Sequence, residues 1–239
     1  MKNLMIYVNP VKGFTGDAGD LVKVQIDNSL RLGWKKEDIL LVTNFDFKHN
    51  GVKAVLIEDN VFCPFRPLST KTVTVAYLLD KDMIEKDIVY WVHDLDAYQL
   101  AELNVDLEMK DVGFTDYGWA KKWSLGSYFF KESSKDMFQW IKDTIYEYKA
   151  EDERALVRLT KKNFNNINDR YKKLNITYNL GMRWVEENYK RADKPLKVVH
   201  FHPYARGNNM RVFMHGENNL HIPLISKELS EIFKKYGIK

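Results

Sequence analysis

Two aspartates one residue apart, Asp94 and Asp96, follow the apolar run Val89-Tyr90-Trp91-Val92, which is typical of a buried strand. Because an unpaired buried carboxylate is costly, this strand end predicts a positive partner. In an extended segment the two carboxylates point to the same side and can face one cation. Mg²⁺ and Mn²⁺ prefer such oxygen ligands and leave positions open for phosphate oxygens. The alternative is that Asp94 caps the next turn and Asp96 is solvated, since an isolated Asp-x-Asp is common.

A histidine near a second predicted strand end is the next candidate ligand. His200 follows Lys197-Val198-Val199, and neutral imidazole is a good third ligand for Mn²⁺. His202 lies two residues on, faces the same side, and is the natural substitute. The alternative is a core histidine that donates to a backbone carbonyl.

Asp152 and Glu153 open a predicted helix, where acidic residues are expected because the helix dipole favours them. The functional interpretation makes Asp152 a base or hydrogen-bond acceptor for a substrate hydroxyl. Lys71 and Arg66 lie at or just before another helix start and could meet phosphate oxygens, although exposed cations are usually solvated.

The first half of the chain alternates strand and helix patterns, which predicts parallel strands with helices on both faces. Strands are expected at 4–8, 39–43, 52–57 and 88–92, with helices over 22–34 and 70–79. In such sheets ligands collect at the carboxyl ends of the strands. The polar residues expected to share this rim are Asn9, Asn44, Asp46, Asp94 and Asp96.

The second half is more mixed. Strands are expected at 112–115, 127–130 and 197–201, and helices over 137–148, 152–159 and 226–236. No repeat or linker divides the chain, so we expect one domain over residues 1–239, with a nucleotide-binding half to about residue 100 and a sugar and acceptor half over 101–239.

The composition is that of a globular protein of 239 residues, with 45% hydrophobic and 13% aromatic residues. The net charge of +4 is spread over the chain, which disfavours a nucleic-acid partner. No apolar run approaches the roughly 20 residues of a transmembrane helix, and the start lacks a signal-peptide cleavage site. With a single cysteine, Cys63, we expect a cytoplasmic protein.

Taken in order, these segments resemble a metal-dependent glycosyltransferase of the GT-A fold, with its DxD motif. The resemblance covers most of the chain and rests on Tyr7-Val8-Asn9-Pro10, Lys71, His93-Asp94-Leu95-Asp96, Trp123-Ser124-Leu125-Gly126-Ser127-Tyr128-Phe129-Phe130, Asp152-Glu153-Arg154-Ala155-Leu156, Tyr178-Asn179 and Lys197-Val198-Val199-His200-Phe201. The compact size of the chain and the sequence of its DxD segment are similar to those of glycosyltransferases encoded by large algal viruses.

The resemblance implies a three-layer αβα sandwich around a mostly parallel sheet, and transfer of a sugar from a UDP-sugar to a glycan hydroxyl with Mn²⁺ or Mg²⁺. It places Asp94, Asp96 and His200 on the metal, and Asp152 with Glu153 at the reacting centre. The residues expected to bind the nucleotide-sugar are Tyr7, Val8, Asn9, Pro10, Asn44, Lys71, His93, Asp94, Leu95, Asp96, Gly126 and Ser127. Inversion and retention of the anomeric centre both stay open.

Two other functions are compatible with these patterns. A sugar-nucleotide nucleotidyltransferase uses a similar sheet and metal, but its glycine-rich, lysine-bearing loop has only a thin counterpart in Val11-Lys12-Gly13-Phe14-Thr15-Gly16. A non-catalytic glycan-binding module would use an aromatic cluster of Tyr117, Trp119, Trp123 and Tyr128.

Overall fold

A seven-stranded sheet forms the centre of the protein in a computed structural model that describes residues 1–115, 123–181, 183–204 and 209–238. The strand order is β10-β8-β9-β6-β1-β2-β5, and all neighbours are parallel except β9, which is antiparallel to both β6 and β8. The strands are β1 (Lys2–Tyr7), β2 (Ile39–Thr43), β5 (Val55–Leu56), β6 (Tyr90–His93), β8 (Val112–Thr115), β9 (Ser124–Phe130) and β10 (Tyr171–Leu174).

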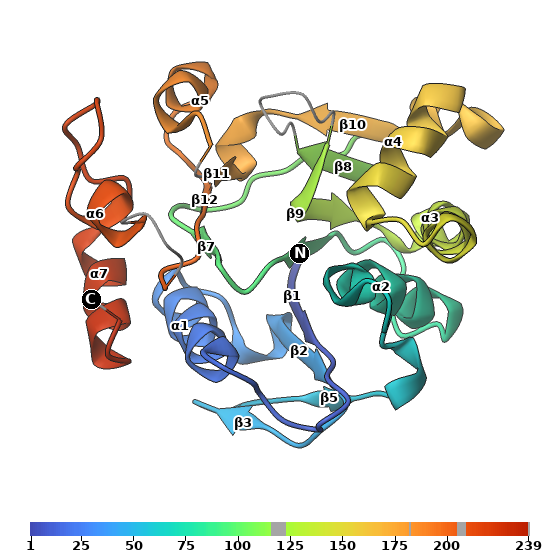
Figure 1. The fold of residues 1–239 in the computed structure, drawn as a ribbon, viewed down its shortest axis with the longest axis horizontal. Coiled ribbons are helices and arrows are strands. Elements are labelled where there is room, and N and C mark those ends of the chain that lie inside the picture. The colour runs from blue at the N-terminus through green and yellow to red at the C-terminus, as the bar shows by residue number, and fades with distance from the viewer. Residues whose placement is uncertain (116–122, 182, 205–208, 239) are drawn as a thin grey trace.

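Helices cover both faces of this sheet, as Figure 1 shows with α1 on one side and α2, α3 and α4 on the other. These helices are α1 (Ala18–Arg31), α2 (Thr70–Asp80), α3 (Lys135–Tyr148) and α4 (Asp152–Lys162). Alternation along β1 explains the layers, since successive side chains point to opposite faces. Leu4 and Ile6 belong to the core under α2, α3 and α4, whereas Met5 packs with Val22 and Ile26 of α1. The predicted three-layer α/β architecture with a mostly parallel sheet is confirmed.

One predicted strand is divided in the structure. The sequence favoured a single strand over 52–57, but β4 (Val52–Lys53) forms a hairpin with β3 (Lys48–His49), and only β5 joins the central sheet. Between them, the Ala54 amide donates to the Phe47 carbonyl at 2.9 Å, so the chain changes partner at this residue.

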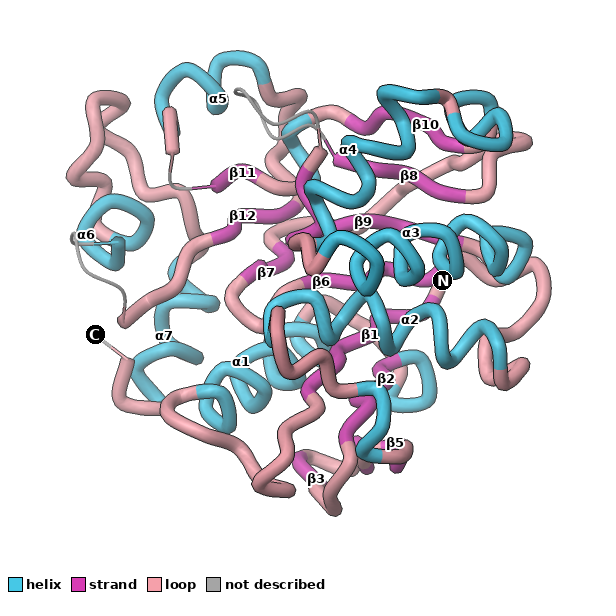
Figure 2. The backbone as a smooth tube through the Cα atoms, turned by 45° about the vertical axis from the view of Figure 1, so that its right-hand side comes forward, coloured by secondary structure: helices cyan, strands magenta, loops and turns pink. Residues whose placement is uncertain are grey.

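A small second sheet lies beside β6 and has the order β11-β12-β7, as Figure 2 shows. It consists of β7 (Ala97–Gln99), β11 (Leu180–Gly181) and β12 (Val198–His200). β7 begins directly after Asp96 and pairs antiparallel with β12, so that His200 lies opposite Ala97. The Phe201 amide also donates to the Asp96 carbonyl at 3.0 Å. This sheet therefore carries His200 to the end of β6.

The C-terminal part adds α5 (Val185–Arg191), α6 (Asn209–Met214) and α7 (Lys227–Lys235). Leu229 and Phe233 of α7 share a core with Leu21 and Val24 of α1, which confirms the predicted helix near residue 226. Short 3₁₀ helices lie at Lys36–Asp38, Asp59–Val61, Pro67–Ser69, Glu132–Ser134, Phe164–Asp169 and Ile176–Tyr178. Among the described residues, every helix is too short or too polar to cross a lipid bilayer.

Candidate active site

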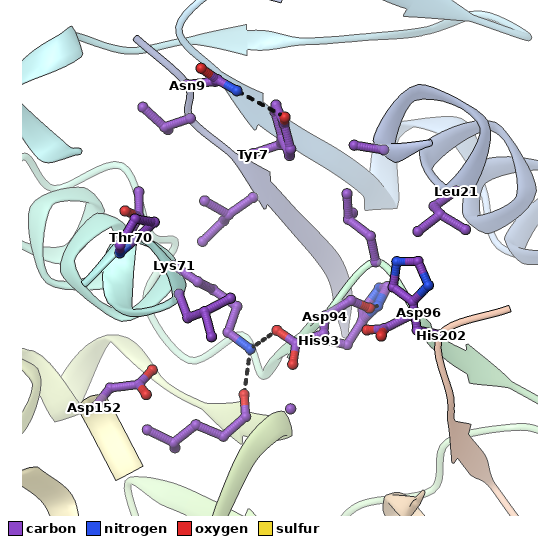
Figure 3. A pocket seen from close by; sticks show the side chains of 18 of the residues that line it. Tyr7, Asn9, Leu21, Thr70, Lys71, His93, Asp94, Asp96, Asp152 and His202 are labelled. Atoms are coloured by element: carbon purple, nitrogen blue, oxygen red, sulfur yellow. Dashed lines mark hydrogen bonds and ion pairs between the residues drawn. The ribbon is translucent and has the colours of Figure 1, made fainter. Parts of the chain in front are cut away.

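A cavity of about 730 Å³ opens at the carboxyl ends of β1 and β6. Figure 3 shows its side chains, with Tyr7 and Asn9 from the end of β1, Lys71 from α2 and Asp94 from the turn after β6. Its position agrees with the rule that ligands bind at the carboxyl ends of parallel strands. Asn9, Asp94 and Asp96, which the sequence placed on one rim, all line it.

Three side chains within the described residues form a group that could hold a metal ion, namely Asp94, Asp96 and His200. One ligand atom from each lies within 4.8 Å of the others. His200 Nε2 is 3.2 Å from Asp96 Oδ1 and 3.5 Å from Asp94 Oδ2. His202, the substitute considered from the sequence, instead directs Nε2 to Asp17 Oδ2 at 3.4 Å.

The donor set suits a divalent cation of the Mg²⁺ or Mn²⁺ type. Adjacent ligand atoms of an octahedral ion with bonds of about 2.1 Å lie roughly 3.0 Å apart, close to the two distances that His200 Nε2 makes. Three protein ligands of this kind also leave further positions free for other oxygens. The residues present therefore fit such an ion.

Electrostatics inside the group agree with mutual charge stabilisation. Burial alone would raise the pKa of Asp96, but the charge and hydrogen bond of His200, with the nearby His202, lower that pKa to about 2. Burial alone would lower the pKa of His200, but Asp96 and Asp94 raise it above the ordinary value. Without a metal, the two carboxylates thus favour the protonated form of His200.

Lys71 approaches the group from the opposite side. Its side chain is 9% exposed, and its Nζ forms an ion pair with Asp94 Oδ1 and donates to the Leu125 carbonyl. Figure 3 shows both contacts. Asp94 thus places one oxygen on Lys71 and the other toward His200. A lysine in this position brings positive charge to the cavity wall next to the candidate metal group.

The segment Ser124-Leu125-Gly126 at the start of β9 holds several of these groups in place. The Gly126 carbonyl accepts the Asp94 amide at 2.8 Å, and the Leu125 amide donates to Glu153 Oε1 at 3.3 Å. A Cβ at Gly126 would lie 2.3 Å from His200 Cε1 and 3.2 Å from Asp94 Oδ2. Glycine at this position is therefore what lets the imidazole reach the carboxylates.

Asp152, the first residue of α4, is buried at the cavity wall. Thr72 Oγ1 of α2 donates to Asp152 Oδ2 at 2.5 Å, and the Asp152 amide donates to Ser69 Oγ at 3.1 Å. Burial raises the pKa of Asp152 to about 6, although Lys71 and Thr72 act against the rise. A carboxyl group whose pKa lies near neutral pH, at the wall of a polar cavity, is suited to exchange or position a proton.

The far end of the cavity is built on a network at the end of β1. Asn44 Oδ1 accepts the Asn9 amide at 3.0 Å, and Asn44 Nδ2 donates to the Asn9 carbonyl at 2.8 Å. The Tyr7 hydroxyl accepts from Asn9 Nδ2 at 3.0 Å and from the Thr15 amide at 3.1 Å. These bonds fix the backbone around residue 9 at this end of the cavity.

Most of the residues expected from the sequence lie together in this cavity. Those that line it are Tyr7, Val8, Asn9, Lys71, His93, Asp94, Leu95, Asp96, Gly126, Asp152, Glu153 and His200. His93 is almost fully buried, and burial lowers its pKa to about 3, so it is neutral and contacts Asn3 Oδ1 at 2.8 Å. Pro10, Asn44 and Ser127 stand outside the lining, and Ser127 accepts the Trp91 indole N–H at 2.9 Å.

Other residues at the site were missed from the sequence, among them Asp17 and Thr72. Ser124 and Asn179 stood within segments of the resemblance but were given no role of their own, and Asn179 is a partner of His200. Small polar residues of this kind carry no sequence pattern that marks them. Of the aromatic cluster, Trp123 and Tyr128 are 1% and 0% exposed and have no free face for a sugar ring. Tyr117 and Trp119 lie outside the described residues.

Comparisons with known proteins find no protein-family model and no curated protein sequence that matches this chain. Solved structures do match, and glycosyltransferases are among those that cover 84% to 100% of the chain. The α/β fold with its mostly parallel central sheet is therefore the GT-A glycosyltransferase fold.

Among these structures is the galactosyltransferase LgtC in complex with donor and acceptor sugar analogs, with a TM-score of 0.59, 11% identity, and coverage of 99% of this chain and 95% of LgtC. A glycosyltransferase involved in the glycosylation of the major capsid of PBCV-1 has a TM-score of 0.54, 12% identity, and coverage of 84% and 93%. Mouse xyloside xylosyltransferase 1 has a TM-score of 0.51, 12% identity, and coverage of 84% and 97%.

Proposed function

We propose that this protein is a glycosyltransferase that moves a sugar from a UDP-sugar to a hydroxyl of a glycan acceptor, with Mn²⁺ or Mg²⁺ as cofactor. The observation that carries the proposal is the group of Asp94, Asp96 and His200 beside a cavity at the carboxyl ends of the strands. The fold is one that glycosyltransferases use, including LgtC and the PBCV-1 capsid enzyme. We also propose one catalytic domain over residues 1–239, acting in the cytoplasm, that of the host if the protein is viral.

The metal site would consist of Asp94, Asp96 and His200. A bound divalent cation would offset the negative charge that develops on the departing diphosphate. Lys71 would bind phosphate oxygens from the α2 side, because its ammonium group is held at the cavity wall by Asp94 and the Leu125 carbonyl.

The nucleotide would occupy the end of the cavity formed by Tyr7, Val8 and Asn9, where Asn44 fixes the backbone. Pro10 would act there only through the shape of the turn. On the other side of the metal group, Gly126 lines the cavity and would border the donor sugar. His93, Leu95 and Ser127 would support the DxD segment and β9.

Asp152 would meet the acceptor hydroxyl or the donor sugar, with Glu153 beside it on the cavity wall. If the anomeric centre inverts, the Asp152 carboxylate takes the proton of the acceptor hydroxyl. If the configuration is retained, the same carboxylate positions the substrates. A nucleotidyltransferase is less well supported, because Lys12 forms an ion pair with Asp59 at 3.0 Å and does not line the cavity.

A thermal-shift experiment with UDP and a panel of UDP-sugars, each with and without Mn²⁺, tests the function. A ligand at 100 times its Kd stabilises a protein by about 2.7 kcal/mol, which corresponds to a rise in Tm of at least about 5 °C for a chain of this size. We expect that rise only when UDP and Mn²⁺ are both present. Release of UDP from the matching UDP-sugar, and no release of pyrophosphate from UTP with a sugar 1-phosphate, would then separate this function from a nucleotidyltransferase. No shift with any UDP ligand would end the proposal.

The rate of sugar transfer should depend on the ionisation of Asp152. Because its pKa is raised to about 6, the carboxylate forms as the pH rises through about 6, and kcat measured at saturating Mn²⁺ should rise over that range. Asp152→Asn should remove this rise of kcat with pH and lower kcat by about 100-fold or more. Thr72→Val should move the rise of kcat to higher pH, because this substitution removes the hydrogen bond that favours the carboxylate form of Asp152. If the rise of kcat near pH 6 persists in Asp152→Asn, the ionisation behind it belongs to another group.

A further inference from the structure

A chain of hydrogen bonds lies behind His200, on the side of the ring away from the carboxylates. His200 Nδ1 is 3.0 Å from Asn179 Oδ1. Asn179 Nδ2 in turn donates to Ser124 Oγ at 2.7 Å, and the Gly126 amide donates to the same hydroxyl at 3.1 Å. Asn179 and Ser124 are both buried, at 5% and 2% exposure. The chain therefore connects the imidazole to the start of β9 without passing through solvent.

These partners determine which nitrogen of His200 carries the hydrogen. A neutral imidazole has one N–H group and one nitrogen lone pair, and an amide oxygen can only accept. Since the NH₂ group of Asn179 faces Ser124, its oxygen faces the ring and requires a hydrogen on Nδ1. When Asp94 and Asp96 hold a cation and the ring is neutral, the lone pair is then on Nε2, the atom that lies 3.2 Å from Asp96 Oδ1 and 3.5 Å from Asp94 Oδ2.

The fold holds Asn179 in this place through backbone pairing. Asn179 directly precedes β11, and β11 pairs in parallel with β12, with Leu180 opposite Val199 and Gly181 opposite His200. Ser124 begins β9, which pairs with β6 next to the acidic turn. Three segments far apart in the sequence therefore meet at one imidazole.

We propose that Asn179 is a positioning residue that holds His200 in the tautomer with hydrogen on Nδ1, so that Nε2 is ready to bind a divalent cation, and that Ser124 orients the Asn179 amide. This inference rests on the metal site of the proposed function. It assigns the preparation of that site to two residues that do not touch the metal. Partners of this kind behind a ligating histidine typically change metal affinity by about 10- to 100-fold when they are replaced.

Two substitutions at Asn179 give opposite expected results. In Asn179→Asp an oxygen still accepts from Nδ1 and makes Nε2 more basic, so the Kd for Mn²⁺, measured by calorimetry on the full chain, should stay equal or fall. In Asn179→Leu the acceptor is lost, and the Kd should rise by about 10- to 100-fold. Ser124→Ala should lie between wild type and Asn179→Leu. Asn218→Leu is a matched control, because Asn218 is also buried and its side-chain partners within the described residues are backbone groups of α6 and of its own loop.

The tautomer itself can be observed when a diamagnetic cation is bound. In protein with ¹⁵N-labelled histidine and saturating Mg²⁺, the His200 signal, assigned by its loss in His200→Gln, should show hydrogen on Nδ1 and none on Nε2. Asn179→Leu should shift it toward the Nε2–H form, and Asn179→Asp should not.

The outcomes separate this inference from the proposed function. Equal Mn²⁺ affinity in wild type and Asn179→Leu, with an unchanged tautomer, would overturn the role of Asn179 alone. Mn²⁺ binding that follows the expected order, in a chain that binds no UDP-sugar, would overturn the proposed function and leave the role of Asn179 standing. A wild-type chain that binds no Mn²⁺ would overturn both.

Discussion

Replacing Asp96 with alanine should abolish Mn²⁺-dependent binding of UDP, with a loss of affinity of at least about 100-fold, or about 2.8 kcal/mol. Asp96 supplies one of the three ligand atoms of the candidate metal group and is the main charge partner of His200. Calorimetry of UDP binding in the presence and absence of Mn²⁺ measures the effect. The metal-independent part of UDP binding should change little, because Tyr7, Asn9 and Lys71 stay in place.

Asp17→Ala is the matched control for this experiment. Asp17 is another carboxylate that lines the same cavity, but it pairs with His202 and not with the metal group. It should retain most of the Mn²⁺ dependence. Asp94→Ala is a less clean variant, because it also removes the ion-pair partner of the buried Lys71 and should lower the thermal stability. Unchanged Mn²⁺–UDP affinity in Asp96→Ala would remove the metal site from this position.

Gly126→Ala should be nearly as damaging, although it adds only one methyl group. That methyl would lie 2.3 Å from His200 Cε1, so the imidazole must leave the carboxylates or the β9 backbone must shift. We expect the Mn²⁺ affinity to fall by about 10- to 100-fold. Overpacking of this kind also costs about 1–3 kcal/mol of stability, which thermal unfolding would show.

Gly181→Ala provides the comparison. Gly181 lies opposite His200 in the small sheet, but a Cβ there would meet, among the described residues, just the His200 carbonyl, at 3.8 Å, which is an ordinary contact. This variant should bind Mn²⁺ as wild type does. If both alanine variants bound the ion equally, the close approach of the β9 backbone would have no part in forming the site.

The elements that the sequence predicted best are those with long apolar patterns. β1, β2, β6 and the helices α1, α2, α3, α4 and α7 each bury a continuous stripe or strand, and the pattern is visible without the fold. β10, with the sequence Tyr171-Lys172-Lys173-Leu174, was missed because two of its four residues are lysines. β7 and β11 have three and two residues, which is too short for any periodicity.

In the candidate site, too, some residues could be predicted from the sequence and others could not. Asp94 and Asp96 could be found because a buried strand ends on them, and the two-residue spacing of an extended chain sets their common direction. The choice between His200 and His202 could not be made from the sequence, because both alternate to the same side of β12 and its continuation. The structure distinguishes them by distance. Asn179 and Thr72 act through single hydrogen bonds to distant residues, and such partners emerge only from the folded chain.

The pairing of β7 with β12 determines where the chain can accept inserted residues. Asp96 and His200 are 104 positions apart, yet one rung of backbone hydrogen bonds between three-residue strands sets their distance. A slip of one residue in this pairing would turn Val199 or Phe201 toward the carboxylates. Insertions of many residues in the intervening loops should therefore be tolerated far better than one extra residue within Ala97–Gln99 or Val198–His200. Lengthening either strand by a single residue should abolish ion binding in an otherwise folded protein.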